Sequence, residues 1–140
     1  MVIYPVSTSK FGLGDWPGSY RTPLGELEVT QKIGDGLARS TADSPGRDPI
    51  VTRIIWLRGC EPQNANAFVR DIYIHETPEE RNIGLPVSYG CVRMRSSDIV
   101  NLFDIVGGKQ MITATYSWRA FCSSKGRACD SSGRSIYRSE

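Results

Sequence analysis

Short β-rich segments separated by polar loops constrain the fold of this chain most strongly. Residues 27–33 alternate apolar and polar side chains, which is the pattern of a half-buried strand. Residues 34–49 hold several Gly, Pro, Asp and Ser residues and are typical of a loop. Further runs of β-forming residues lie at positions 50–57, 68–75 and 111–116. These segments predict a mainly β protein.

One helix is expected to begin near Ser96 or Ser97, either of which can cap its start. Asp98 favours the positive end of the helix dipole, and Gly107-Gly108 is a stop signal. The apolar residues between these points fall on one helical face: Ile99, Leu102, Phe103 and Val106. We expect this face to pack on the sheet.

The chain length of 140 residues predicts one domain with its own core. Residues 1–116 carry 12 basic and 13 acidic side chains, whereas residues 117–140 carry five and two. That second stretch is rich in Ser, Gly and Arg and poor in core-forming residues. We therefore expect a domain over residues 1–116 and a solvated, polar, basic tail over 117–140. Its few charges do not favour a nucleic-acid partner.

Four cysteines leave several chemistries open. Cys122 and Cys129 can close a small disulfide loop in an oxidising compartment, and Cys60 is expected to be a buried apolar thiol. A zinc site is not expected, because the chain has one histidine and no Cys-x-x-Cys pair. The first residues, Met1-Val2-Ile3-Tyr4-Pro5, show neither a secretory signal nor a membrane span.

The only histidine, His75, is followed by Ser88-Tyr89-Gly90-Cys91, a segment we call the nucleophile turn. A cysteine that acts as a nucleophile near neutral pH needs a neighbouring base, usually an imidazole. Residues 68–75 are expected to form a strand with His75 at its end, and the polar loop 76–86 can fold back from it. The two side chains are therefore candidates for a nucleophile and its base. The structural alternatives are a satisfied strand-end histidine and a small buried thiol.

The residues Ser88, Gly90, Cys91, Val92 and Arg93, following His75, resemble the YkuD-type L,D-transpeptidases. The signature of that family is a histidine, a loop, and then Ser/Thr-His-Gly-Cys before an apolar residue and Arg or Asn. The resemblance covers about residues 3–116 and includes three further stretches: residues 4–10, 20–25 and 73–75.

The chain departs from this signature at two positions. Tyr89 occupies the place of the second histidine, and Glu76 replaces a common glycine. A tyrosine hydroxyl stays neutral near pH 7, so Tyr89 can take over a structural role but not a protonic one. The first histidine, which serves as the base in that family, is present as His75.

The resemblance implies a compact β-sandwich or barrel-like fold with at least one helix after the nucleophile turn. It also implies a strand pair upstream of Val6, which this chain would lack or have in a short form. The implied enzyme acts on peptidoglycan stem peptides, is a target of carbapenems and needs neither metal nor organic cofactor. We expect a monomer in the periplasm or on the exterior of the cell envelope.

In the implied reaction, His75 takes the thiol proton and Cys91 attacks the bond between the L-centre of a diamino acid and D-alanine. A thioester forms and is transferred to an acceptor amine. Water as the acceptor would make the protein an L,D-carboxypeptidase. A non-catalytic wall-binding domain is a third interpretation, in which Tyr89 and Glu76 mark lost turnover.

Other residues around the pair have expected roles. The backbone N–H groups of Tyr89, Gly90 and Cys91 are the natural oxyanion donors, because glycine lets the chain turn tightly. Arg93 either binds a substrate carboxylate or supports the loop.

Ser88 bonds within its own turn or orients His75, and Tyr73 lines the cleft or joins the core. No acidic partner for the imidazole is identifiable, since Glu76 is expected to point elsewhere. A backbone carbonyl is then expected to orient the ring.

Overall fold

The computed structural model describes residues 2–34, 53–116 and 135–139 of the 140. In chain order its elements are β1 (Val2–Val6), β2 (Thr8–Ser9), β3 (Gly25–Ile33), β4 (Ile54–Gly59), the 3-10 helix η1 (Pro62–Asn64), β5 (Tyr73–Glu76), the 3-10 helix η2 (Glu80–Asn82), β6 (Pro86–Ser88), β7 (Val92–Met94), α1 (Ser96–Ile105), β8 (Met111–Tyr116) and β9 (Ser135–Ser139). No helix of the described segments has both the length and the apolar character that crossing a membrane requires.

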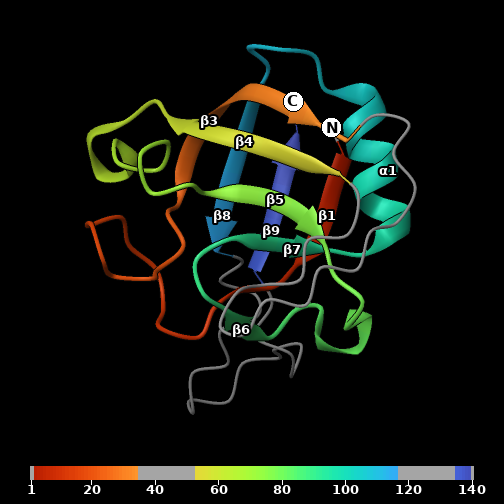
Figure 1. Ribbon diagram of the computed structural model, residues 1–140, viewed down its shortest axis with the longest axis horizontal. Coiled ribbons are helices and arrows are strands. Elements are labelled where there is room, and N and C mark those ends of the chain that lie inside the picture. The colour runs from red at the N-terminus through yellow and green to blue at the C-terminus, as the bar shows by residue number, and fades with distance from the viewer. Residues whose placement is uncertain (1, 35–52, 117–134, 140) are drawn as a thin grey trace, which may run out of the picture.

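The strands form one curled sheet and a small separate pair (Figure 1). The sheet has the order β1-β9-β8-β3-β4-β5-β7, and β2 pairs with β6 in parallel. Its two outer strands meet at a bridge in which the backbones of Ser7 and Arg93 exchange hydrogen bonds of 2.9 and 3.0 Å. This contact closes the curl, so the expected mainly β, barrel-like fold is confirmed.

The core lies inside this curl and is covered by α1 (Figure 1). The helix buries Ile99, Leu102 and Phe103, and Val106 at its end is buried as well. Full burial of each such side chain contributes about 1.5–3 kcal/mol. The predicted helix and its apolar face are confirmed. The helix directly follows β7, the strand that begins after the nucleophile turn, and its packing on the core anchors the end of that strand.

The start of α1 differs from the expectation. Arg95 is the N-cap residue and makes no side-chain cap, and neither Ser96 nor Ser97 takes that role. The Ser96 N–H instead donates to the Glu80 carboxylate of η2 at 2.9 Å. A carboxylate at this end also suits the positive pole of the helix dipole, so a distant residue replaces the local cap.

Strand β3 confirms the alternation expected for residues 27–33 only in its first half. Leu27 and Val29 are buried, whereas Ile33 is exposed. The pairing register with β4 shifts between Val29 and Gln31, which is the signature of a bulge. A one-residue shift reverses the face of every later side chain, and this explains why Ile33 points outward.

The strand expected over residues 68–75 is much shorter in the structure. Turns occupy the chain up to Asp71, and only Tyr73–Glu76 forms β5. A backbone bond of 3.0 Å from Arg70 to Asn66 closes the last turn, and Asp71 has a left-handed φ of 57°. These local bonds override the β propensity of Phe68 and Val69. The strand also runs on to Glu76, so His75 lies within it and not at its end.

The polar tail expected over residues 117–140 differs from the structure at its far end. Ser135–Ser139 form β9, which pairs antiparallel with both β1 and β8. Residues 117–134 lie outside the described residues, as do most of the expected loop 34–49 and the first residues of the run 50–57. That run continues as β4, and the run 111–116 is confirmed as β8. The boundary of the domain at residue 116 stays a prediction.

Candidate active site

Two neighbouring parallel strands carry the candidate nucleophile and base. On β5 and β7, Ile74 lies opposite Val92 and His75 lies opposite Arg93. Cys91 immediately precedes β7, so it stands across from Tyr73 in the same register. Side chains two positions apart share one face of a strand. The sheet therefore presents Cys91 and His75 on one face of adjacent strands.

The nucleophile turn is held by its own serine and by a threonine from elsewhere. The Ser88 hydroxyl donates to the Cys91 carbonyl at 2.6 Å and accepts from the Gly90 N–H at 3.3 Å. The Thr22 hydroxyl donates to the Gly90 carbonyl at 2.8 Å. Gly90 has φ 125°, a conformation that only glycine adopts without strain. Ser88 thus bonds within its turn, one of its two expected roles. Thr22 lies in the stretch 20–25 that resembles the family, but nothing in the sequence indicated that its hydroxyl would bind the nucleophile turn.

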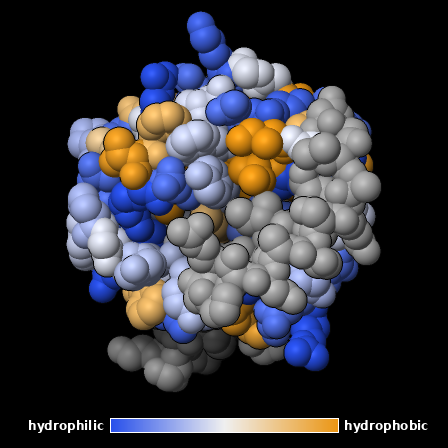
Figure 2. Space-filling model, viewed as in Figure 1, coloured by the Kyte–Doolittle hydropathy of each residue, from blue (hydrophilic) through white to orange (hydrophobic). Residues whose placement is uncertain are grey.

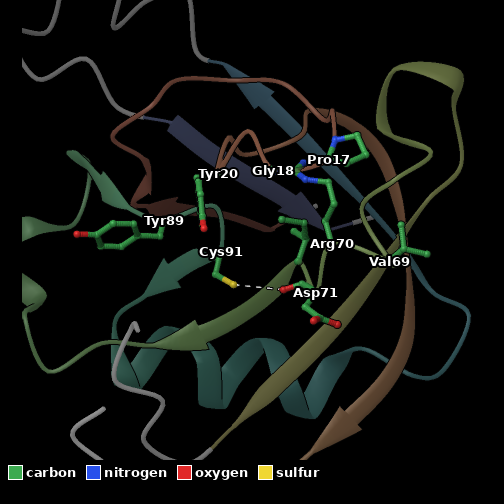
Figure 3. A pocket seen from close by; sticks show the side chains of 9 residues that line it. Pro17, Gly18, Tyr20, Val69, Arg70, Asp71, Tyr89 and Cys91 are labelled. Atoms are coloured by element: carbon green, nitrogen blue, oxygen red, sulfur yellow. Dashed lines mark hydrogen bonds between the residues drawn. The ribbon is translucent and has the colours of Figure 1, made fainter. Parts of the chain in front are cut away.

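A cavity of about 290 Å³ opens beside the thiol (Figure 3). Cys91 is half-buried, and its Sγ contacts the backbone carbonyl of Asp71 at 3.5 Å. The residues that line the cavity come from the loop before β3, the turn before β5 and the nucleophile turn: Pro17, Gly18, Tyr20, Val69, Arg70, Asp71, Ile72, Tyr89 and Cys91. The sulfur is therefore reachable from this cavity, unlike a thiol enclosed in an apolar core.

The imidazole of His75 is fully buried behind this surface. Its Nδ1 lies 2.8 Å from the backbone carbonyl of Glu76. A carbonyl only accepts hydrogen bonds, so a neutral ring must carry its proton on Nδ1 and keep its basic lone pair on Nε2. The structure thus supplies the backbone carbonyl expected to orient the ring. The Glu76 side chain is buried as well.

Arg93 and Tyr73 occupy positions beside the pair and do not line the cavity. The Arg93 side chain is 7% exposed, with Nη1 3.4 Å from the Glu79 carboxylate, a position that favours loop support. Tyr73 is half-buried and meets Trp56 edge to face at 5.4 Å. Burial raises the pKa of the Tyr73 phenol, and the nearby Asp71 carboxylate, a hydrogen bond to it and Cys91 raise it further.

Exposed aromatic rings flank the mouth of the cavity. Tyr20 and Tyr89 line it, and Phe11 lies 5.9 Å from both rings. The Lys10 ammonium donates to the Tyr89 hydroxyl at 2.9 Å and sits 4.2 Å from the centre of that ring. In the place of the family's second histidine, Tyr89 therefore forms a cation–π contact at the surface. Lys10 and Phe11 were not among the expected site residues.

A buried ion pair fixes one wall of the cavity. Arg70 Nη1 lies 2.8 Å from Asp15 Oδ1, and both side chains are nearly inaccessible. The same guanidinium donates to the carbonyls of Gly14 and Arg21 at 3.3 and 2.6 Å. It thereby ties the loop that carries Tyr20 to the turn before β5. Sequence reasoning missed this pair because 55 positions separate its members and nothing local links them.

The expectation for Cys60 is wrong, because its side chain is exposed at the end of β4. Partial desolvation and then the Glu28 carboxylate raise the pKa of this thiol. Cys122 and Cys129 lie outside the described residues. No cluster of three or more metal-ligating side chains occurs in the segments 2–34, 53–116 and 135–139.

Apolar side chains on the face shown in Figure 2 form separate spots among polar ones. Single exposed apolar residues are normal on soluble domains, and a continuous patch would mark a large docking surface. The cavity beside Cys91 combines a reactive side chain with a recess.

Comparison with known proteins bears on the fold and the family of this chain. A solved structure, the LD transpeptidase LdtMt1 in complex with imipenem, matches with a TM-score of 0.50 and 19% identity over 79% of this chain. The match spans 47% of that chain, about half its length, and supports the fold. No curated protein matches. The family model of the L,D-transpeptidase catalytic domain, YkuD, matches residues 1–115, so the chain belongs to this family.

Proposed function

We propose that this chain is a cysteine-dependent peptidoglycan L,D-transpeptidase in which Cys91 is the nucleophile and His75 the base. The observation that carries the proposal is the accessible Cys91 thiol at the cavity, placed by β7 next to the strand that carries His75. The substrate is a tetrapeptide stem that ends in D-alanine, as the family membership suggests. We place its action outside the cytoplasmic membrane, as a monomer without a cofactor.

The first half-reaction forms a thioester. The Nε2 lone pair of His75 takes the thiol proton, and the Cys91 sulfur adds to the carbonyl carbon of the L-centre in the third residue. The C–N bond to D-alanine then breaks, and the imidazolium gives its proton to the leaving amine. The Glu76 carbonyl at Nδ1 keeps the ring in the tautomer that this cycle needs.

The second half-reaction reverses these roles. An acceptor amine adds to the thioester carbonyl, His75 takes the proton of the amine, and the thiol leaves with that proton. The new peptide bond replaces the C–S bond, and the enzyme returns to its starting state.

The nucleophile turn supplies the oxyanion donors in this proposal. The N–H groups of Tyr89, Gly90 and Cys91 lie in one tight turn, and Gly90, which adopts φ 125°, has no side chain to block it. The Gly90 N–H makes only a long bond of 3.3 Å to Ser88. A charged oxygen is a stronger acceptor than a hydroxyl and can draw this donor away. Each such donor is worth about 3 kcal/mol in the transition state.

Arg93 and Tyr73 are assigned supporting roles. The contact of Arg93 with Glu79 and its backbone pairing with Ser7 hold the start of β7, where the nucleophile turn ends. Tyr73 packs edge to face on Trp56 and is assigned the role of supporting the sheet next to Cys91.

Acylation by imipenem, the ligand named for LdtMt1, tests the proposal. Intact-mass spectrometry is expected to show one adduct per chain, which peptide mapping places on Cys91. The exposed Cys60 thiol is an internal control, because its raised pKa keeps it protonated to higher pH. Cys91→Ala is expected to abolish the adduct. An unmodified folded protein, or an adduct that persists in Cys91→Ala, would overturn the assignment.

A further inference from the structure

We propose that Asp71 determines the donor specificity of this site by binding the protonated side-chain amine of the diamino acid at the third stem position. This inference rests on the proposed function and names the substrate class more closely. Asp71 lines the cavity, is exposed, and its own backbone carbonyl contacts the Cys91 sulfur at 3.5 Å (Figure 3).

Asp71 supplies the accessible charge among the residues that line the cavity. Arg70 also lines it, but the Arg70 side chain is 8% exposed and is paired with Asp15 at 2.8 Å. The same guanidinium also donates to two backbone carbonyls. The other lining residues are apolar or hydroxyl-bearing, apart from Cys91. A cationic group that enters the cavity therefore meets a carboxylate and no competing free cation among the lining residues.

The backbone fixes where Asp71 stands. Asp71 has φ 57°, a left-handed conformation that Asp and Asn tolerate better than most residues. Ile72 connects Asp71 to β5, so the turn places Asp71 next to the strand that lies beside the nucleophile turn. The Asp71 carboxylate also lies near the Tyr73 phenol, whose pKa is raised by burial first and by this carboxylate second.

The cavity also suits the hydrocarbon stem of a diamino acid. Val69 and Ile72 line it on either side of Asp71 in the sequence, and Val69 is 74% exposed. A long amine side chain lays its methylene groups on apolar surface and keeps the ammonium at a polar partner. With the carbonyl of the same residue at Cys91, a four-carbon stem has the length to bring its ammonium to a neighbouring carboxylate.

Paired donor peptides measure this recognition. One tetrapeptide carries L-lysine at the third position, and the other carries 6-hydroxynorleucine, in which a hydroxyl replaces the ammonium. The ratio of their dissociation constants is measured by NMR titration of the Cys91→Ala protein, which binds without turnover. We expect the lysine peptide to bind about fivefold tighter, equal to about 1 kcal/mol at 1.4 kcal/mol per tenfold. The preference should shrink at 1 M salt.

Asp71→Asn in the same background removes the charge and retains a residue type that accepts the left-handed backbone. It is expected to bring the ratio close to one. Asp104→Asn, the same change at an exposed position of α1 away from the cavity, is the matched control and should keep the fivefold ratio. A ratio near one in the Cys91→Ala protein, or a ratio unchanged by Asp71→Asn, would overturn the inference.

The two experiments distinguish a failure of the proposed function from a failure of this inference. An amine preference that depends on Asp71, in a chain that imipenem never acylates, would leave the binding site standing and remove the transferase. An imipenem adduct on Cys91 without any amine preference would do the reverse.

Discussion

The buried ion pair between Asp15 and Arg70 allows a quantitative test of how the cavity wall is held. Asp15→Asn removes one charge and keeps the size of the side chain. The side chains of the pair are 5% and 8% exposed, so the guanidinium that remains has little access to water. Breaking a buried pair by removing one partner typically costs about 3–5 kcal/mol. Two backbone carbonyls still accept from Arg70, which favours the lower end, about 3 kcal/mol.

Urea unfolding followed by circular dichroism measures this loss. A change of about 3 kcal/mol corresponds to a midpoint about 1.5 M lower at a slope of about 2 kcal/mol per M. The melting temperature is expected to fall by about 10 °C for a chain of this size. The exposed pair Arg58–Glu28 is a matched control, because its atoms are 2.9 Å apart, close to the 2.8 Å of the buried pair. Glu28→Gln is expected to cost less than about 1 kcal/mol.

Salt separates the two pairs further. At 1 M ionic strength the Debye length is about 3 Å, so the contribution of the exposed pair should vanish while that of the buried pair persists. Equal losses below about 1 kcal/mol for Asp15→Asn and Glu28→Gln would refute the claim that burial makes the first pair important.

Three further predictions follow from individual positions. His75→Ala is expected to slow acylation by at least about a hundredfold in stopped-flow assays, whereas Tyr89→Phe, which loses only a surface hydrogen bond, keeps part of the rate; full activity in the histidine variant would contradict this. Glu28→Gln is expected to speed iodoacetamide alkylation of Cys60 near pH 8, because removing that carboxylate lowers the raised pKa and increases the thiolate fraction; peptide mapping measures the rate, and an unchanged rate would contradict the assigned cause. Gly59→Ala is expected to lower the urea midpoint by at least about 1 M, because a Cβ there would lie 1.8 Å from a backbone oxygen of η1; an unchanged midpoint would contradict this.

The parts of the fold that the sequence predicted depend on local pattern. Strands β3 and β8 and the helix α1 show alternation or helical spacing within one segment. The bulge in β3 turns the Ile33 side chain to the outer face, and Ser135–Ser139 form a strand because they pair with β1 and β8. Both outcomes depend on neighbours that a single segment does not reveal.

At the candidate active site, too, local motifs could be predicted from the sequence and long-range contacts could not. The turn around Cys91 could be recognised because Ser88 and Gly90 are close in sequence and form one motif. The place of Asp71 at the thiol arises only when β5 and β7 meet, and the tie from Arg70 only when a distant loop packs on the turn before β5. Such long-range contacts have no local signal, and so sequence reasoning missed them.

The transfer reaction itself is the sharpest test of Cys91 as the nucleophile of an L,D-transpeptidase. The wild-type protein is incubated with a tetrapeptide donor that ends in D-alanine and with an acceptor amine, and the products are identified by mass spectrometry. We expect release of D-alanine, a donor joined to the acceptor, and no product from Cys91→Ala. A donor peptide left intact by the wild-type protein, or a donor that is only hydrolysed when the acceptor is present, would contradict the proposed transpeptidase activity.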